Sequence, residues 1–305
     1  MTQTKKSLFK ASFEESLNLQ DDGFLQFQKK DVYNKLVNYF KNGKPSFGIR
    51  IQSFILTILF PVGLNFMVYV CSRSLHDAHP KELAHPVSQH PILTVEVYLI
   101  CLLIWLLVVF VGKFVRRAYL LPYRYHFHAC TFLIWLVVEF NLLAIDLSLP
   151  ALSFWGIVAI FGLMFILACR MFAGRVRVLK NLMYGTDFSP NVGHKMASKI
   201  AVYGMGILGL GVIIRILLSV FSIKLSDTMT LLGLFLTWMI LSLALIAMII
   251  YMEFPFFLQA YYKWTYPEEY REWEGKSLEE WYGKKYLKKH KDLYQTDKVE
   301  EKGHV

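Results

Sequence analysis

Long apolar runs fill the middle of the chain, and polar residues separate them at intervals. A helix needs about 20 mostly apolar residues to cross a hydrocarbon core about 30 Å thick. Six runs have roughly this length, so the pattern predicts six transmembrane helices. They cover residues 51–71, 92–112, 127–147, 151–169, 200–223 and 229–253.

The apolar runs are continuous rather than alternating, which favours helices over the strands of a membrane barrel. In lipid, a helix satisfies its own backbone hydrogen bonds. The sequence therefore predicts an all-α fold, a polytopic helical bundle embedded in a membrane. The third run contains several polar residues, and we include it because residues 131–138 are largely apolar.

The segment before the bundle shows two different patterns. Residues 24–41 place Leu25, Val32 and Leu36 toward one helical face and lysines elsewhere, which predicts an amphipathic helix. This helix would lie in the membrane interface before the first span, or it would pack as a soluble helix on the adjoining loops. Residues 11–23 contain four acidic side chains and are expected to form a loose arm.

The tail begins with an aromatic stretch, residues 254–264, of the kind found at membrane interfaces. Residues 265–268 have the spacing of a capping box, Gly275 follows as a stop signal, and residues 277–280 repeat the capping pattern. We therefore expect a short helical tail. The predicted organisation is an N-terminal arm with its amphipathic helix over 1–50, a six-helix transmembrane domain over 51–253, and a tail over 254–305.

Composition supports this class of protein. Hydrophobic residues make up 55% of the 305 residues and charged residues 18%, whereas a soluble chain carries about a quarter charged residues. These values exclude a disordered chain and a collagen. The four cysteines lie in or at the ends of predicted spans without pairing or metal spacing, which excludes a disulfide-stapled module. No cofactor is expected.

Lys and Arg are distributed unequally between the two sides of the predicted bundle. The side that carries both termini holds 29 of the 33, the other side holds three, and Arg215 lies within a span. Because cytoplasmic loops are enriched in these residues, we expect both termini in the cytoplasm and a multi-pass protein of the plasma membrane. The net charge of +10 then reflects contact with membrane lipids, and nucleic acid is not expected as a partner.

Charged residues inside the spans mark the candidate site, because burying each one costs roughly 2.5–3.5 kcal/mol. At about 100° per residue, His128, Glu139 and Asp146 share one face of the third run. Estimated depths place Arg215 level with these two acids and with Glu96 of the second run. We expect an ion-paired cluster centred on Arg215, which is either a substrate or proton path or a structural lock between helices.

Pro61 and Gly63 lie near the middle of the first run, and Asn65 follows them. Proline removes a backbone hydrogen bond and kinks a helix. We therefore expect a kink here, either for packing or, as in transporters, beside a substrate.

The outer loop between the first and second runs is rich in histidine. It contains His76, His79, His85 and His90, and the first two are about one helical turn apart, so they could share a metal ion with a third ligand. No recognised ligand spacing is present. Exposed histidines that titrate near neutral pH are the simpler interpretation, and no metal is expected.

The predicted layout resembles that of six-span ABC exporter permeases, with both ends inside and a helix before the first span. The resemblance is one of topology, and the very short outer loop over residues 224–228 departs from it. No G-x-x-x-x-G-K-[ST] motif occurs, so the resemblance implies a separate ATPase as partner. The same layout suits a proton-linked carrier that works as a homodimer.

Two other functions compete with transport. A non-catalytic accessory, immunity or assembly protein would act through the charged tail and would also lack motifs. A membrane-embedded lipid-modifying enzyme would gather acids, histidines or metal ligands near one interface, yet H-E-x-x-H, Asp-rich and G-x-S-x-G motifs are missing from the sequence. We therefore expect a transport-type protein rather than an enzyme.

Overall fold

Long helices dominate the computed structural model of the chain, which describes residues 6–40, 46–79, 81, 83, 86–115, 117–185 and 227–293. These ranges contain no strand, which confirms the all-α prediction. Five helical stretches within them are long and apolar enough to cross a membrane. They cover Phe47–Asp77, Val95–Gly112, Ala118–Ser148, Phe154–Met183 and Met229–Thr265.

Each stretch overlaps one of the runs predicted from the sequence, and most extend beyond it. The helix α8 (Phe154–Met183), for example, continues well past the predicted end at residue 169 and includes the charged Arg175. A helix that leaves the apolar layer keeps its backbone hydrogen bonds, so hydropathy alone does not mark its end. The predicted fifth run over residues 200–223 lies outside the described residues.

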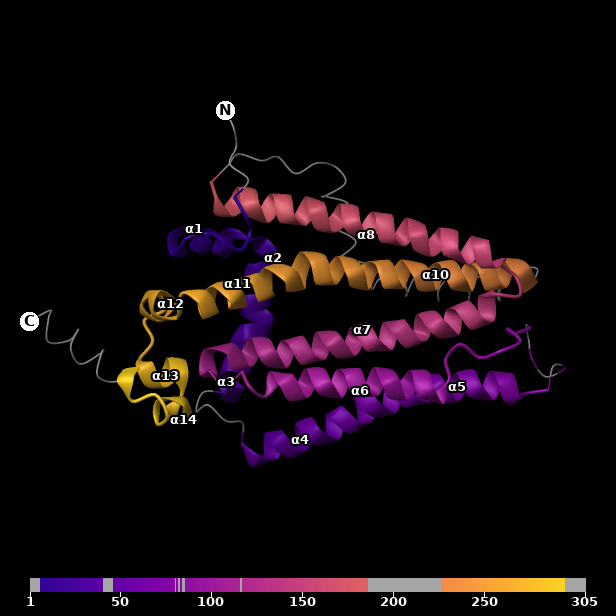
Figure 1. The fold of residues 1–305 in the computed structure, drawn as a ribbon, viewed down its shortest axis with the longest axis horizontal. Helices are drawn as coiled ribbons and strands as arrows, with labels where there is room; N and C mark the ends of the chain where they lie inside the picture. The colour runs from indigo at the N-terminus through magenta and orange to yellow at the C-terminus, as the bar shows by residue number, and fades with distance from the viewer. Residues whose placement is uncertain are drawn as a thin grey trace, which may run out of the picture.

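The long helices run side by side and alternate in direction from α4 to α8 (Figure 1). One end, which we call the cap end, carries α1 (Phe13–Leu17), α12 (Pro267–Trp273), α13 (Leu278–Tyr282) and α14 (Lys284–Leu287). We call the opposite end, with residues 86–94, the loop end. α8 finishes at the cap end, whereas α10 starts at the loop end. The elements are α4 (Phe47–Thr57), η3 (Ile58–Leu64), α5 (Asn65–Asp77), α6 (Val95–Gly112), η4 (Ala118–Leu120), α7 (Leu121–Ser148), α8, α10 (Asp227–Met248), η5 (Ile249–Glu253) and α11 (Phe254–Thr265).

α7 lies in the middle of the bundle. On one side it packs against α5 and α6, where the Trp135 ring lies 6.0 Å from that of Tyr98 and 5.9 Å from that of Trp105. On another side it packs against α10, where the rings of Phe140 and Trp238 are 4.6 Å apart. α8 in turn packs against α10. Large interlocking aromatic side chains therefore set the order of the helices.

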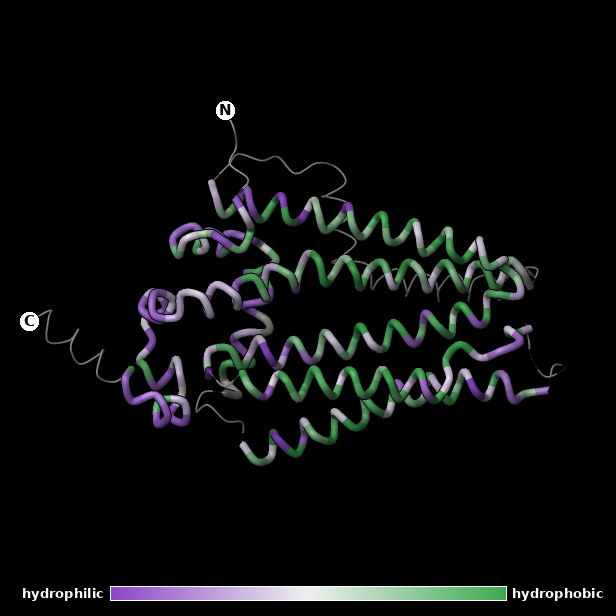
Figure 2. Tube along the Cα trace, in the orientation of Figure 1, coloured by the Kyte–Doolittle hydropathy of each residue, from purple (hydrophilic) through white to green (hydrophobic). Residues whose placement is uncertain are grey.

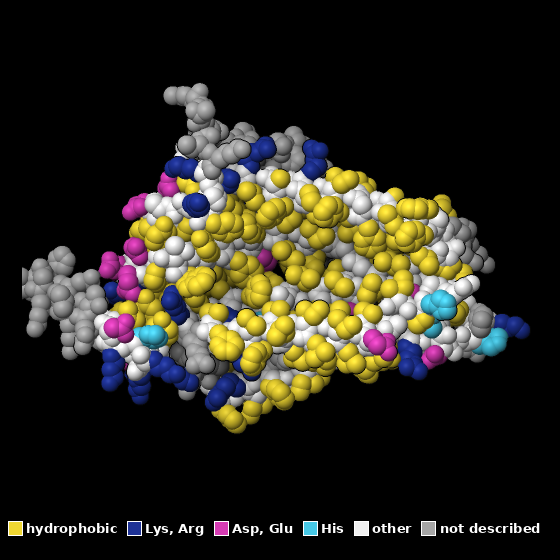
Figure 3. Space-filling model, in the orientation of Figure 1, with side chains coloured by type: hydrophobic (Ala, Val, Ile, Leu, Met, Phe, Trp, Pro, Cys, Tyr) yellow, Lys and Arg dark blue, Asp and Glu magenta, His cyan; other side chains and the backbone are white. Residues whose placement is uncertain are grey.

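Apolar side chains cover much of the outer surface of the bundle. Hydrophobic residues follow the long helices, whereas hydrophilic residues gather toward the two ends (Figure 2). On the face drawn in Figure 3 the same belt is visible, with charged side chains at its margins. Leu103, Leu107, Trp155 and Phe165 are among its exposed members. So large an apolar surface has to be shielded from water, and membrane lipid is the environment that suits five apolar helices of this length. The chain is built as a multi-pass membrane protein.

The segments before and after the bundle pack together at the cap end. Leu19, Leu25, Tyr262, Tyr270 and Trp281 form the fully buried centre of this unit, which we call the cap. Besides α11, which contains Tyr262, its elements are α1 (Phe13–Leu17), η1 (Asn18–Asp21), α2 (Gly23–Gln28), η2 (Lys29–Tyr33), α3 (Asn34–Phe40), α12 (Pro267–Trp273), α13 (Leu278–Tyr282) and α14 (Lys284–Leu287).

The cap corrects the prediction of a loose acidic arm over residues 11–23. Ser12 and Glu15 form a capping box at the start of α1, and the hydroxyl oxygens of Ser16 and Tyr270 are 2.9 Å apart. Residues 23–40, where the sequence predicts an amphipathic helix, form the successive helices α2, η2 and α3, which pack on the bundle with Leu25 buried. This packing supports the alternative of a docked helix over a free interfacial one.

The tail follows its capping signals only in part. Ser277 and Glu280 form the predicted capping box of α13, and Gly275 adopts a φ of 61° just after α12. The capping box predicted at residues 265–268 is wrong. Thr265 still belongs to α11, and its hydroxyl donates to the carbonyl of Tyr261. Because α11 continues the long helix from the bundle, Thr265 is not available as a helix start.

The first membrane-length helix changes from an α-helix to a π-helical turn at the residues where the sequence predicts a kink. η3, a π-helical turn, contains Pro61 and Gly63 and connects α4 to α5. Asn65 is fully buried, and its Nδ2 donates to the Pro61 carbonyl at 2.7 Å. A Cβ atom on Gly63 would lie 3.0 Å from the carbonyl oxygen of Ile58. The π turn thus accommodates a proline that a regular helix would not.

Candidate functional site

α7 carries polar side chains on two opposite faces. His128 and Asp146 lie on the face turned toward α6 and the loop that precedes it, as their contacts with Gly112 and Ser88 show. Glu139 shares this face by the helix repeat. His126 and Cys130 are rotated about half a turn from them and face η5. One helix therefore contributes to two separate polar sites.

Asp146 is fully buried near the loop end and holds the loop there in place. Its carboxylate accepts hydrogen bonds from Ser88 Oγ at 2.8 Å and from the backbone N–H of Ile92 at 3.0–3.1 Å. The backbone carbonyl of Asp146 accepts a further bond from the Ser88 N–H at 3.1 Å. Neutral donors of the loop, rather than a cation, thus satisfy this carboxylate in the described part of the chain.

Glu139 is fully buried near the middle of α7. Its Oε1 accepts a hydrogen bond from Trp135 Nε1 at 2.6 Å, whereas its Oε2 has no hydrogen-bond partner among the described residues. The indole of Trp135 packs against Tyr98 and Trp105, so the carboxyl group lies in an aromatic surrounding. A half-satisfied carboxyl group at membrane depth is costly, which makes Glu139 a candidate functional residue.

Glu96 lies elsewhere, exposed in the first turn of α6. A carboxylate is favourable there because the N-terminal end of a helix carries partial positive charge. The described residues therefore bring Glu139 and Asp146 to the interior and leave Glu96 at the surface. Arg215 lies outside the described residues, so its pairing with any of these acids stays a prediction.

His128 lies against the end of α6. A Cβ atom built on Gly112 would be 2.6 Å from Cε1 and Nε2 of the His128 ring, so the ring occupies the space that a glycine leaves open. The Nδ1 of His128 is buried and has no partner in the part of the chain described. Arg124, one turn earlier, donates to the carbonyls of Gly112 and Val115 at 3.2 and 2.8 Å. This group closes the joint between α6 and α7.

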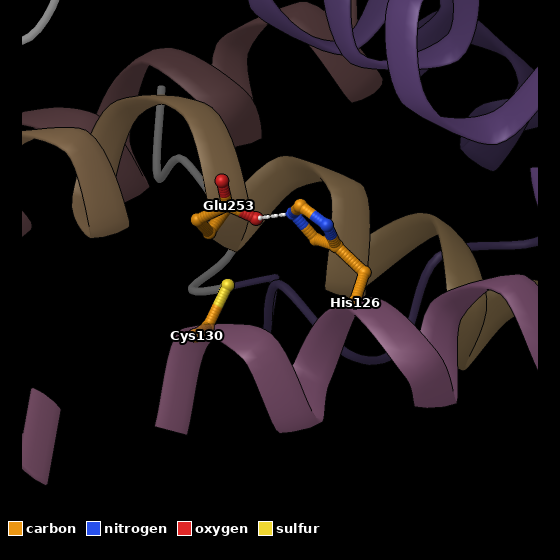
Figure 4. Close-up of side chains that lie close together, drawn as sticks. All are labelled: His126, Cys130 and Glu253. Carbon is orange, nitrogen blue, oxygen red and sulfur yellow. Dashed lines mark hydrogen bonds and ion pairs between the residues drawn. The ribbon is translucent and has the colours of Figure 1, made fainter. Parts of the chain in front are cut away.

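A second polar group lies near the cap end, where α7 meets η5 (Figure 4). His126 Nε2 lies 2.5 Å from Glu253 Oε2, and Cys130 points toward the same carboxylate. One ligand atom from each of these three side chains lies within 4.8 Å of the others. Cys130 and Glu253 are buried, and His126 is mostly so. Imidazole, thiol and carboxylate together form a set that can hold a metal ion.

The sequence contains only half of the signal for this group. His126 and Cys130 are four residues apart, which places them on one helix face, one turn apart. Glu253 follows more than 120 residues later, at the end of the last apolar run. No local spacing connects it to the other two, so the group exists only through the packing of α7 on η5.

The loop histidines predicted as weak metal candidates do not form such a group. His76 uses Nδ1 toward the Ser72 carbonyl at 2.9 Å, and His79 Nδ1 accepts from the N–H of Lys81 at 3.3 Å. His90 is exposed, and His85 lies outside the described residues. In the described ranges, His126, Cys130 and Glu253 alone meet the distance criterion for a three-ligand site.

Buried ion pairs join the cap to the bundle around this group. Arg175 of α8 donates to Asp22 at 2.8 Å and to the Tyr251 carbonyl at 2.9 Å. Lys263 Nζ lies 2.6 Å from Glu274, with both side chains largely buried. Burial, reinforced by the negative charge of Glu274, raises the pKa of the nearby Tyr33 phenol well above its usual value. The cap is therefore an integral part of this end of the bundle.

No protein-family model, curated protein or solved structure matches the chain. The function is therefore argued from the arrangement of its own side chains.

Proposed function

We propose that the chain is a transport-type protein of the plasma membrane, either a homodimeric carrier or an export permease that works with a separate ATPase. The observation that carries this proposal is Glu139, a fully buried acid inside an apolar helix with one oxygen that has no partner among the described residues. Ionisable residues at membrane depth are retained mainly where protons, ions or substrates move. Membrane lipids cover the exposed apolar belt.

The proposed topology has six spans with both termini in the cytoplasm. α8 ends at the cap end and α10 begins at the loop end, and this placement supports one further span between them. Residues 200–223 supply an apolar run of the required length. The distribution of Lys and Arg supports a cytoplasmic cap. Arg215 would then enter the membrane on this additional span, the fifth along the chain, where an acid of α7 can neutralise it.

Proton flux into vesicles tests the role of Glu139. The purified chain is reconstituted in liposomes that contain a pH-sensitive dye, and a potassium gradient with valinomycin drives proton entry. We expect the wild type to admit protons and Glu139→Gln to reduce the flux to that of protein-free vesicles. Glutamine can still accept the hydrogen bond from Trp135, so the change removes the titratable group and little else.

The matched control is Glu96→Gln, because Glu96 is an exposed acid on the neighbouring helix α6. This variant is expected to keep the full flux. Equal flux in the wild type and Glu139→Gln would contradict a proton path through Glu139. Absence of flux in the wild type, together with ATPase activity that co-purifies with the chain, would favour the export permease over the carrier.

The cap favours a second candidate, a non-catalytic accessory or assembly protein. Its helices form a folded unit with two exposed lysines on α14 and no recognisable catalytic motif among the described residues. If the chain is such a protein, deletion of residues 283–305 should abolish its assembly or accessory role in cells. Proton flux into vesicles should then stay at the background of protein-free vesicles in every variant. The lipid-modifying enzyme is supported only by the gathering of His126, Cys130 and Glu253 near one end of the bundle.

A further inference from the structure

We infer that His126, Cys130 and Glu253 form a binding site for a transition-metal ion of the Zn²⁺ type. The site lies at the cap end, between the first turns of α7 and the π-helical turn η5 (Figure 4). It is separate from Glu139, which lies on the opposite face of α7. This inference does not depend on the proposed transport function.

The chemistry of the three side chains selects the ion. A thiolate is a poor ligand for Mg²⁺ and Ca²⁺, whereas a nitrogen, sulfur and carboxylate set suits Zn²⁺ and its neighbours. Three protein ligands with a water molecule as the fourth form a common tetrahedral site. Binding would release to water both the thiol proton of Cys130 and the proton of the hydrogen bond between His126 Nε2 and Glu253 Oε2.

The distances are close to those required. Ligand atoms on one tetrahedral Zn²⁺ are separated by about 3.3–3.6 Å, given metal–ligand bonds of about 2.0–2.3 Å. The three atoms here lie within 4.8 Å of one another, and the hydrogen-bonded pair of His126 and Glu253 is at 2.5 Å. A shift of about 1 Å, within reach of side-chain rotation, would therefore make room for the ion.

Two features around the three side chains point independently to a built site. Gln28 of α2 donates from Nε2 to Glu253 Oε1 at 2.8 Å, and its own Oε1 is buried without a partner in the described structure. This amide can orient the carboxylate and accept a hydrogen bond from a metal-bound water. In addition, Glu253 ends a π-helical turn, an irregularity often found at functional sites.

The test uses the purified full chain in detergent, stripped with a chelator and then titrated with Zn²⁺ alone or Co²⁺ alone. We expect one Zn²⁺ per chain at this site and, with Co²⁺, the near-ultraviolet absorption of a thiolate-to-cobalt charge transfer. Cys130→Ser removes the cobalt band, and His126→Gln removes saturable Zn²⁺ binding. Gln28→Leu keeps all three ligands and weakens binding about 10–100-fold.

The controls are Cys101→Ser on α6 and His128→Gln on the opposite face of α7, and both are expected to leave the cobalt band unchanged. Zn²⁺ bound by the loop histidines would add to the stoichiometry but produce no thiolate band. A wild type without this band, or a band that Cys130→Ser leaves unchanged, overturns the inference. Either result would mean that His126 and Glu253 form a hydrogen bond without binding a metal ion.

A second measurement leaves the three ligands in place, so it remains decisive if the ligand variants fail to fold. In a chain whose Cys71, Cys101 and Cys169 are replaced by serine, Cys130 is the remaining cysteine. Zn²⁺ is expected to slow its alkylation by a thiol reagent, and chelation is expected to restore the rate. Alkylation that proceeds at the same rate with and without Zn²⁺ also overturns the inference.

Discussion

Gly112 lacks a side chain, and this allows the His128 ring of α7 to pack directly against the end of α6. The His128 ring fills the space beside its backbone, and a Cβ atom there would come within 2.6 Å of two ring atoms. We expect Gly112→Ala to lower the free energy of unfolding by about 1–3 kcal/mol, because the ring or the helix has to move. Unfolding by SDS in mixed micelles measures the change.

The control for this substitution is Gly162→Ala in α8. A Cβ atom on Gly162 meets nothing within 4 Å, and alanine costs less conformational entropy in a helix than glycine does. This variant is expected to unfold at the same or a slightly higher SDS concentration. Equal destabilisation by the two substitutions would show that the contact between Gly112 and His128 does not contribute specifically to the free energy of unfolding.

Side-chain types identified the irregular positions of the apolar runs but not the contacts made there. Proline in the first apolar run predicted a kink, because its ring removes a backbone bond wherever the helix lies, and the structure has a π-helical turn at this position. The acids of α7 were identified as candidates because charge in an apolar run is visible in the sequence. Their partners were not, since Ser88, Ile92 and Trp135 offer donors of the commonest kinds.

Among the elements, the N-terminal helices depend on one buried ion pair. Arg175 of α8 donates to Asp22, which also caps α2 by accepting from the Leu25 N–H at 3.0 Å. We expect Arg175→Met to destabilise the docked helices by about 3–5 kcal/mol, because it leaves a buried carboxylate without its cation. Trypsin should then cleave faster at Lys29 and the lysine that follows it.

Two further variants separate this ion pair from a general effect of removing arginine. Arg73→Met breaks an exposed pair with Asp77 and is expected to change the cleavage rate little. Arg175→Met combined with Asp22→Asn removes the unpaired charge but keeps the cap of α2, so part of the stability should return. Unchanged trypsin cleavage in Arg175→Met would show that apolar contacts alone hold these helices.

For the whole molecule, the ends of the described helices predict a topology that can be measured. A reporter tag inserted after Gly185 should lie on the same side of the membrane as the cap. A tag inserted after Gln89 should lie on the opposite side, as should one placed just before Asp227. Protection of each tag from an impermeant protease in sealed vesicles gives its side. If the tags at 185 and 227 lie on the same side of the membrane, the single span predicted over residues 200–223 is excluded.

The sequence was sufficient for the class of protein and for most of the apolar helices. Hydrophobic runs of membrane length are a local property, and a helix is the local way to satisfy a backbone in lipid, so no long-range contact is needed to recognise them. The capping pattern of the tail, as at Ser277, is equally local. Sequence patterns were weaker where a helix continued beyond the apolar layer, as α8 and α11 do.

Packing between distant segments forms the cap and brings His126, Cys130 and Glu253 together. The acidic residues near the N-terminus look solvent-exposed in the sequence, yet Asp22 meets Arg175 across 153 positions of chain. Glu253 reaches His126 across 127 positions, through a π turn that no composition rule identifies. Contacts of this kind depend on how helices cross and rotate, which many side chains determine together. Local periodicity therefore predicts which residues face inward, and the assembled bundle determines which of them meet.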